Sequence, residues 1–100
     1  MKGHMDFSRV SEEALARFPG LLMDWLPGGK IVGTEYLALN PRRPDRCIGS
    51  FSVNVKTGRW CDFATGDKGG DPVSLYAYLL GLSQGDAARE LAEQLGVGCV

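Results

Sequence analysis

The residues of this sequence best suited to chemistry are basic and aromatic, and they gather in its middle third. Cationic side chains bind phosphates and aromatic faces stack on unpaired bases, so the combination is typical of single-stranded nucleic-acid binding. The alternative is a solvated loop beside core aromatic residues, and Trp60 in particular suits such a core. In the binding interpretation five cations hold phosphates and Trp60 stacks on a base. The predicted contact residues are Arg42, Arg43, Arg46, Lys56, Arg59 and Trp60.

The charge of the 100-residue chain is unevenly distributed, although 11 Lys and Arg against 12 Asp and Glu leave a formal net charge of −1. Residues 30–68 carry seven basic and four acidic residues, whereas residues 69–100 carry one basic and four acidic residues. The overall balance excludes a strongly basic nucleic-acid tail. The middle third, with its net charge of +3, nevertheless suits an anionic partner.

The sequence contains no recognisable catalytic constellation. Its single histidine, His4, lies in an opening run, Met-Lys-Gly-His-Met, that is typical of a cloning scar. Neither a Gly-x-Ser-x-Gly nucleophile elbow nor a His-Glu-x-x-His metal motif occurs. We therefore expect a binding module and not an enzyme, with residues 1–5 outside the fold and residues 6–100 forming a single domain.

The cysteines set the expectations for redox state and metal binding. They are Cys47, Cys61 and Cys99. Their odd number and wide spacing do not suit a disulfide framework, so a reduced, cytoplasmic setting is expected. A four-ligand zinc site would need every Cys and His in the chain, so we expect neither a metal nor another cofactor. The remaining alternative is a metal site built from Cys47, Cys61 and carboxylates.

The glycine-rich segment of residues 66–71 allows two further interpretations. A glycine-rich loop before a helix can bind phosphate through backbone N–H groups, but this one lacks a Gly-Lys-Ser/Thr end and Asp71 would repel an anion. Asp62, Asp67 and Asp71 could also hold Mg²⁺. We favour a flexible loop in which Asp67 suits a turn and Asp71 caps the next helix.

Helices are predicted at both ends of the chain and strands in its middle. Residues 35–39 suit a strand, and alternating apolar residues favour a hairpin over residues 51–63. No apolar run approaches the ~20 residues of a membrane helix. The predicted helices begin near Ser11, cover residues 21–26, extend from an Asp71 cap to Gly81, and extend from a Ser83 cap to Gly96.

Residues 36–96 resemble the N-terminal zinc-binding domain of bacterial and phage DNA primases, the CHC2 type. The matching segments are residues 50–53 (Ser-Phe-Ser-Val), 69–75 (Gly-Gly-Asp-Pro-Val-Ser-Leu) and 81–95. In that family a metal-ligand pair, a Ser-Phe strand, a hairpin, a second ligand pair, Gly-Gly-Asp and two helices follow in this order. The resemblance implies an α+β fold, in which a small antiparallel zinc-ribbon-like sheet over about residues 30–63 is flanked by N- and C-terminal helices.

The metal ligands of that family are missing from the corresponding positions. Phe63 and Gly66 stand where its second cysteine pair is expected, and Asn40 and Pro41 stand nearest to its first pair. The chain thus resembles a metal-free zinc ribbon of the kind found in phage- and plasmid-associated primase-helicase proteins. A buried Phe63 would replace part of the stabilisation by zinc, and the helices would supply the rest.

Together these features predict a role in DNA replication. The expected function is a non-catalytic module of a DNA primase or primase-helicase that engages single-stranded template DNA. Its expected partners are the primase catalytic domain and helicase domains, with no membrane contact. The alternative is a protein–protein docking module of a replication complex that has lost DNA and zinc binding, with the acidic final helix and residues 21–26 as its interface.

Overall fold

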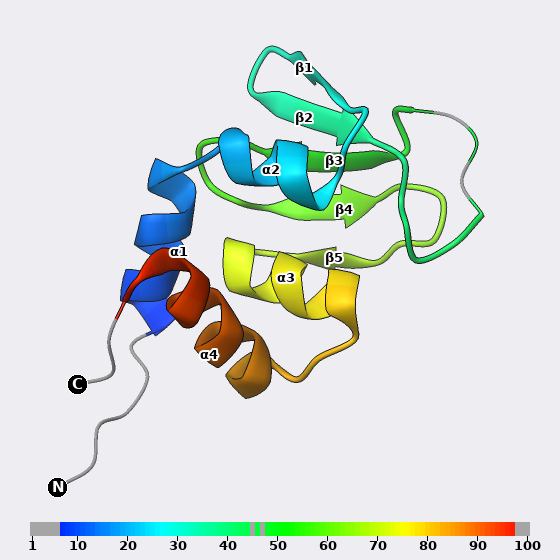
Figure 1. Ribbon diagram of the computed structural model, residues 1–100. Helices are drawn as coiled ribbons and strands as arrows, with labels where there is room; N and C mark the ends of the chain where they lie inside the picture. Colours follow the sequence, from blue (N-terminus) through cyan, green and yellow to red (C-terminus); the bar gives the residue numbers. More distant parts are fainter. Residues whose placement is uncertain (1–6, 45, 47, 98–100) are drawn as a thin grey trace, which may run out of the picture.

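A computed structural model describes residues 7–44, 46 and 48–97 as a five-stranded sheet with helices before and after it (Figure 1). This arrangement confirms the predicted α+β fold. The predictions that concern residues 1–5, Cys47 and Cys99 lie outside the described residues. The elements are α1 (Phe7–Ala16), α2 (Gly20–Trp25), β1 (Lys30–Val32), β2 (Glu35–Ala38), β3 (Phe51–Asn54), β4 (Trp60–Asp62), β5 (Lys68–Gly69), α3 (Pro72–Leu80) and α4 (Gln84–Leu95).

The strands lie in the sheet in chain order, and each is antiparallel to the next. The predicted hairpin is formed by β3 and β4, where Val53 pairs with Trp60 and Phe51 with Asp62. The edge strand β1 lies at the start of the sheet predicted for residues 30–63, and the edge strand β5 extends this sheet on its other side. β5 lies within the segment predicted to be a flexible loop, so pairing with β4 orders part of that loop.

Helices α2 and α3 cover one face of the sheet and bury its aromatic side chains (Figure 1). The Tyr36 hydroxyl donates a 2.7 Å hydrogen bond to the Leu26 carbonyl, which ties the end of α2 to β2. Burial of apolar surface stabilises this layer, at about 25 cal/mol per Å². The buried residues of this core are Leu22, Leu26, Tyr36, Ala38, Phe51, Val53, Trp60 and Leu75.

A second core lies where α1, α3 and α4 pack together beside the sheet (Figure 1). The charged residues of α4 are exposed, as the amphipathic periodicity of this helix predicts. Its apolar residues are buried, and they are Ala87, Ala88, Leu91, Ala92 and Leu95. Tyr76 of α3 lies in this core, and its ring centroid is 5.2 Å from that of Trp25. The two cores therefore share α3, which couples the helices to the sheet.

Capping residues set the first and last residues of the two C-terminal helices, as predicted. The Asp71 carboxylate accepts a 2.7 Å hydrogen bond from the Ser74 N–H, and the Ser83 hydroxyl caps α4 in the same way. Gly81 and Gly96 end these helices with φ of 69° and 75°, the left-handed conformation that glycine adopts at low cost. None of the described helices is long and apolar enough to cross a membrane.

The start of α1 differs from its prediction. The helix begins at Phe7, so Ser11 lies inside it and is not its cap. Val10 and Ala14 are both fully buried in the helical core. Packing of Val10 thus favours helix on the N-terminal side of Ser11, and this tertiary contact outweighs the local capping signal.

Gly69 is expected to be far less tolerant of a side chain than its neighbour Gly70. A Cβ on Gly69 would lie 1.8 Å from the Ser74 Oγ and 2.3 Å from the Trp60 Nε1, whereas a Cβ on Gly70 meets nothing within 4 Å. Gly69→Ala should lower the free energy of unfolding by about 1–3 kcal/mol, the usual cost of overpacking. Chemical denaturation of both variants tests this expectation, and equal losses in Gly69→Ala and Gly70→Ala would contradict it.

Candidate nucleic-acid interface

The sheet face opposite α2 and α3 presents one row of side chains from all five strands. Lys30, Leu37, Ser52, Cys61 and Lys68 are successive cross-strand partners. Because side chains alternate between the two faces of a strand, this row points away from the aromatic core. We call this surface the open face and define it by Lys30, Glu35, Leu37, Ser52, Arg59, Cys61, Phe63 and Lys68.

A hollow of about 260 Å³ lies on the open face beside β4. Phe63 is 72% exposed, more than any other large hydrophobic residue described. Arg59 and Lys68 are also exposed, and both line the hollow with Phe63. The hollow therefore combines an accessible aromatic ring with two cations, and its full lining is Glu35, Ser52, Arg59, Trp60, Cys61, Phe63, Lys68 and Gly69.

Glu35 places a fixed carboxylate on the wall of this hollow. Its Oε1 accepts a hydrogen bond from the Ser52 hydroxyl, and its Oε2 accepts one of 3.0 Å from the Asn54 side-chain amide. Both donors come from β3, the neighbouring strand. The two contacts hold the carboxylate in one orientation, so its direction is set before any ligand arrives.

Cys61 contributes a neutral thiol to the hollow. Burial raises the pKa of the thiol, and the carboxylates of Glu35 and Asp62 raise it further, whereas Lys68 lowers it. A raised pKa leaves the sulfur protonated at neutral pH, and the thiol form is a poor nucleophile and metal ligand. Cys61 thus forms part of the lining, as a half-buried residue of β4.

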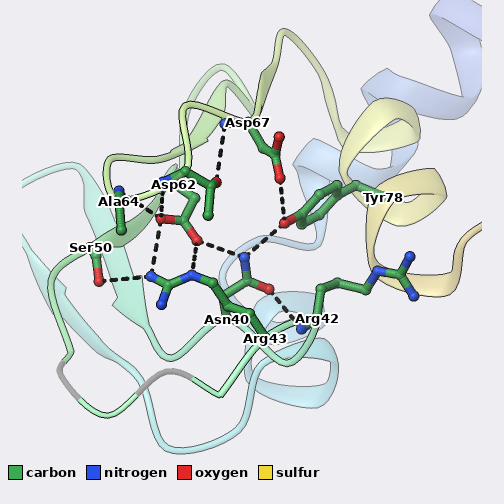
Figure 2. A network of polar contacts seen from close by, with 9 residues as sticks. Asn40, Arg42, Arg43, Ser50, Asp62, Ala64, Asp67 and Tyr78 are labelled. Atoms are coloured by element: carbon green, nitrogen blue, oxygen red, sulfur yellow. Dashed lines mark hydrogen bonds and ion pairs between the residues drawn. The ribbon is translucent and has the colours of Figure 1, made fainter.

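On the helix-covered face, Asp62 is the centre of a buried polar network (Figure 2). The side chain is fully buried, and its Oδ2 accepts 2.7 Å hydrogen bonds from Arg43 Nε and Asn40 Nδ2. Its Oδ1 accepts from Arg43 Nη2 at 3.1 Å and from the N–H of Ala64 and Thr65. The network joins the loop after β2 to the turn after β4.

Arg43 is the largest influence on the ionisation of Asp62. Its hydrogen bonds hold the pKa of the Asp62 carboxyl far below its ordinary value, against the opposing effect of burial, and the bonds from Asn40 and Ala64 lower the pKa further. The network continues from Asn40 Nδ2 to the Tyr78 hydroxyl, which donates to Asp67. No buried side-chain nitrogen or oxygen among the described residues lacks a hydrogen-bond partner.

The described residues do not fit the zinc centre that the primase resemblance would otherwise imply. Within the described part of the chain, no three His, Cys, Asp or Glu side chains are grouped so that they could hold a metal. The segments that the resemblance assigns to ligand pairs, near Asn40 and near Phe63, are instead joined by the Asp62–Arg43 ion pair. No step in the chemistry of this chain is therefore assigned to a bound metal.

The predicted burial of Phe63 is wrong. In β4, Trp60 and Asp62 point toward the helices, so alternation directs Cys61 and Phe63 to the open face. The inward position that an apolar residue would normally occupy is taken by Asp62. Hydrogen bonds from Arg43 and Asn40 to the Asp62 carboxylate offset the free-energy cost of burying its charge.

The structure separates the predicted contact residues instead of gathering them. Lys56 and Arg59 are exposed at the hairpin connection, and Arg59 reaches the open face. Arg42 and Arg46 are exposed in the loop after β2, where the Arg42 guanidinium lies beside Gly81 at the end of α3. Arg43 is held in the ion pair with Asp62 and does not have the free guanidinium that phosphate binding requires (Figure 2).

Trp60 belongs to the core. It is 5% exposed, its Nε1–H donates a 2.8 Å hydrogen bond to the Ser74 hydroxyl, and its ring packs against Phe51 and Tyr78. The stacking role predicted for Trp60 does not fit this burial. Its position agrees with the alternative to base stacking, in which Trp60 is a core residue.

The predicted contact set contains only Arg59 and Trp60 of the eight residues that line the hollow, and it lacks Glu35, Phe63 and Lys68. The alternation of β4 carries a signal for Phe63, since Arg59, Cys61 and Phe63 share one parity and Trp60 and Asp62 share the other. Glu35 lies 24 residues before Arg59 in the chain, and Lys68 lies in the segment predicted to be a loop. The pairing of β2 through β5 brings both to the same surface.

Comparison with protein-family models and with curated proteins finds no match to this chain.

Proposed function

We propose that this chain is a non-catalytic module that binds single-stranded DNA through the open face of its sheet, within a DNA primase or primase-helicase of the phage and plasmid type. The observation that carries the proposal is the exposed Phe63 ring, which lines one hollow together with Arg59 and Lys68. Exposed aromatic rings flanked by cations on a sheet are the common means of holding an unpaired strand.

The charges of the open face support a phosphate backbone as its ligand. Lys30 and Lys68 end the cross-strand row, Arg59 lies beside it, and Glu35 is its one carboxylate among the residues that define the surface. Neighbouring strands are about 4.8 Å apart, so the five-strand row extends over roughly 19 Å. A DNA strand lying along this row would meet cations at both ends, and the Phe63 ring lies beside the row, two residues after Cys61.

The assignment to a replication protein rests on the order of motifs in the sequence. The Ser-Phe strand is β3, and the hairpin pairs it with β4. Gly-Gly-Asp begins in β5 and leads into the two helices, α3 and α4. Primer synthesis would then belong to a separate catalytic domain, and that domain and a helicase would be the partners of this module.

The docking alternative has less support from the surface. Leu22 and Leu26, in the segment suggested as an interface, are buried beneath α2, and Met23 is the exposed apolar side chain of that helix. The acidic face of α4 remains available, with Asp86, Glu90 and Glu93 exposed. A DNA titration separates the two functions.

Replacing Arg59 and Lys68 together by alanine should weaken single-stranded DNA binding and reduce its salt dependence. Each cation that contacts phosphate contributes about −0.7 to the slope of log K against log salt for a single strand, so removing two should change that slope by about 1.4. Fluorescence anisotropy with a labelled oligonucleotide at several salt concentrations measures both effects.

The double variant Arg42→Ala/Arg46→Ala is a charge-matched control, because it removes two exposed arginines from the loop after β2. It should retain most of the affinity and most of the slope. A larger loss in this control would place the binding site on the arginine-rich loop. Absence of binding by the wild-type chain at low salt would overturn the proposed function itself.

A further inference from the structure

The carboxylate of Glu35 has acceptor capacity left on both of its oxygens. A carboxylate oxygen accepts two hydrogen bonds, so the pair offers about four sites. Oε1 uses one site for the Ser52 hydroxyl, and Oε2 uses one for the Asn54 amide. One site therefore remains on each oxygen, and the side chain lines the hollow.

Two adjacent acceptors with a negative charge select among the four bases. Guanine presents two neighbouring donors on its pairing edge, the ring N1–H and the N2 amino group. Adenine and cytosine each place one amino group beside an unprotonated ring nitrogen, which a carboxylate repels. Thymine places one N–H between two carbonyl oxygens. Guanine is thus the base whose donors match both free sites.

We propose that the hollow on the open face recognises a guanine base of single-stranded DNA, with its N1–H and N2 amino group on Glu35 and its ring against Phe63. The inference rests on the proposed DNA binding and names the base that this site prefers. The neutral Cys61 thiol and the bare Gly69 backbone line the hollow and leave its volume of about 260 Å³ open to a planar ring.

The test compares oligothymidines of about ten nucleotides that carry one central guanosine, adenosine, cytidine or thymidine. A bidentate base contact discriminates by about 1–3 kcal/mol, so the guanosine oligonucleotide should bind roughly 5-fold to 150-fold more tightly than the others. A central hypoxanthine retains N1–H and lacks the amino group. It should bind with an affinity between those of guanosine and thymidine.

Glu35→Gln retains the size of the side chain and removes its charge. The preference for guanosine should fall to within about threefold, and a cooperative urea transition like that of wild type reports that the sheet is intact. Glu12→Gln, on the exposed surface of α1, is the matched control and should keep the full preference.

The outcomes separate this inference from the function on which it rests. If none of the oligonucleotides binds, the proposed function fails and the inference with it. If all of them bind with equal affinity, DNA binding stands and the guanine site is overturned. A guanosine preference that persists in Glu35→Gln, or one that hypoxanthine retains in full, would contradict the two-donor contact with Glu35.

Discussion

Replacing Asp62 by alanine is expected to lower the free energy of unfolding by about 3–5 kcal/mol, the cost of leaving one partner of a buried ion pair without the other. Arg43 would lose both of its hydrogen bonds to the carboxylate, and Asn40 would lose one. The N–H groups of Ala64 and Thr65 would lose their acceptor. A domain is stabilised by only about 5–15 kcal/mol, so this variant loses a large share of its stability.

Urea denaturation measures this loss, with Asp67→Ala as the control. Asp67 is exposed and accepts one 2.9 Å hydrogen bond from Tyr78, so its replacement should cost about 1 kcal/mol or less. The pH dependence gives an independent readout. Because the folded-state pKa of Asp62 is lowered, its contribution is complete above about pH 4 and is lost as the pH falls below that value. Equal free energies of unfolding for wild type and Asp62→Ala at neutral pH would contradict a stabilising role of this network.

Replacing Phe63 by alanine is expected to weaken single-stranded DNA binding by roughly 5-fold to 150-fold, because stacking of one base on an aromatic ring is worth about 1–3 kcal/mol. The same substitution should leave the free energy of unfolding within about 0.5 kcal/mol of wild type, since the side chain is 72% exposed. A loss of binding without a loss of stability distinguishes a contact residue from a core residue.

Phe7→Ala supplies the matched control for this measurement. Phe7 is also an exposed aromatic residue, at 46%, but it lies on α1 and outside the open face. Its replacement should leave the affinity within about twofold of wild type. Equal losses of affinity in Phe7→Ala and Phe63→Ala would indicate nonspecific adhesion of DNA to exposed apolar groups, against the proposed interface.

The sequence predicts the C-terminal helices well because their signals are local. Asp71 and Ser83 cap the residues that directly follow them, and Gly81 and Gly96 adopt the left-handed conformation at the helix ends. The edge strand β5 escapes prediction for the opposite reason. With two residues it carries little pattern of its own, and pairing with β4 defines it.

The candidate site depends on contacts that a sequence does not display. Trp60 and Phe63 exchange their expected places because Asp62 faces inward, and its burial is offset by Arg43, 19 residues earlier in the chain. Arg43 looks like its exposed neighbour Arg42 in the sequence, yet the ion pair gives it a structural role. Hydrophobicity alone would place Phe63 inside, and only the hydrogen-bond partners of Asp62 reverse that order.

Amide chemical shifts of the isotope-labelled chain, recorded during titration with single-stranded DNA at low salt, test the central claim most directly. The proposed interface predicts that the largest changes occur on the open face, at Ser52, Cys61, Phe63 and Lys68, with little change on α4. Largest changes at the exposed acidic residues of α4, or no changes at any DNA concentration, would contradict the open face as a DNA-binding surface.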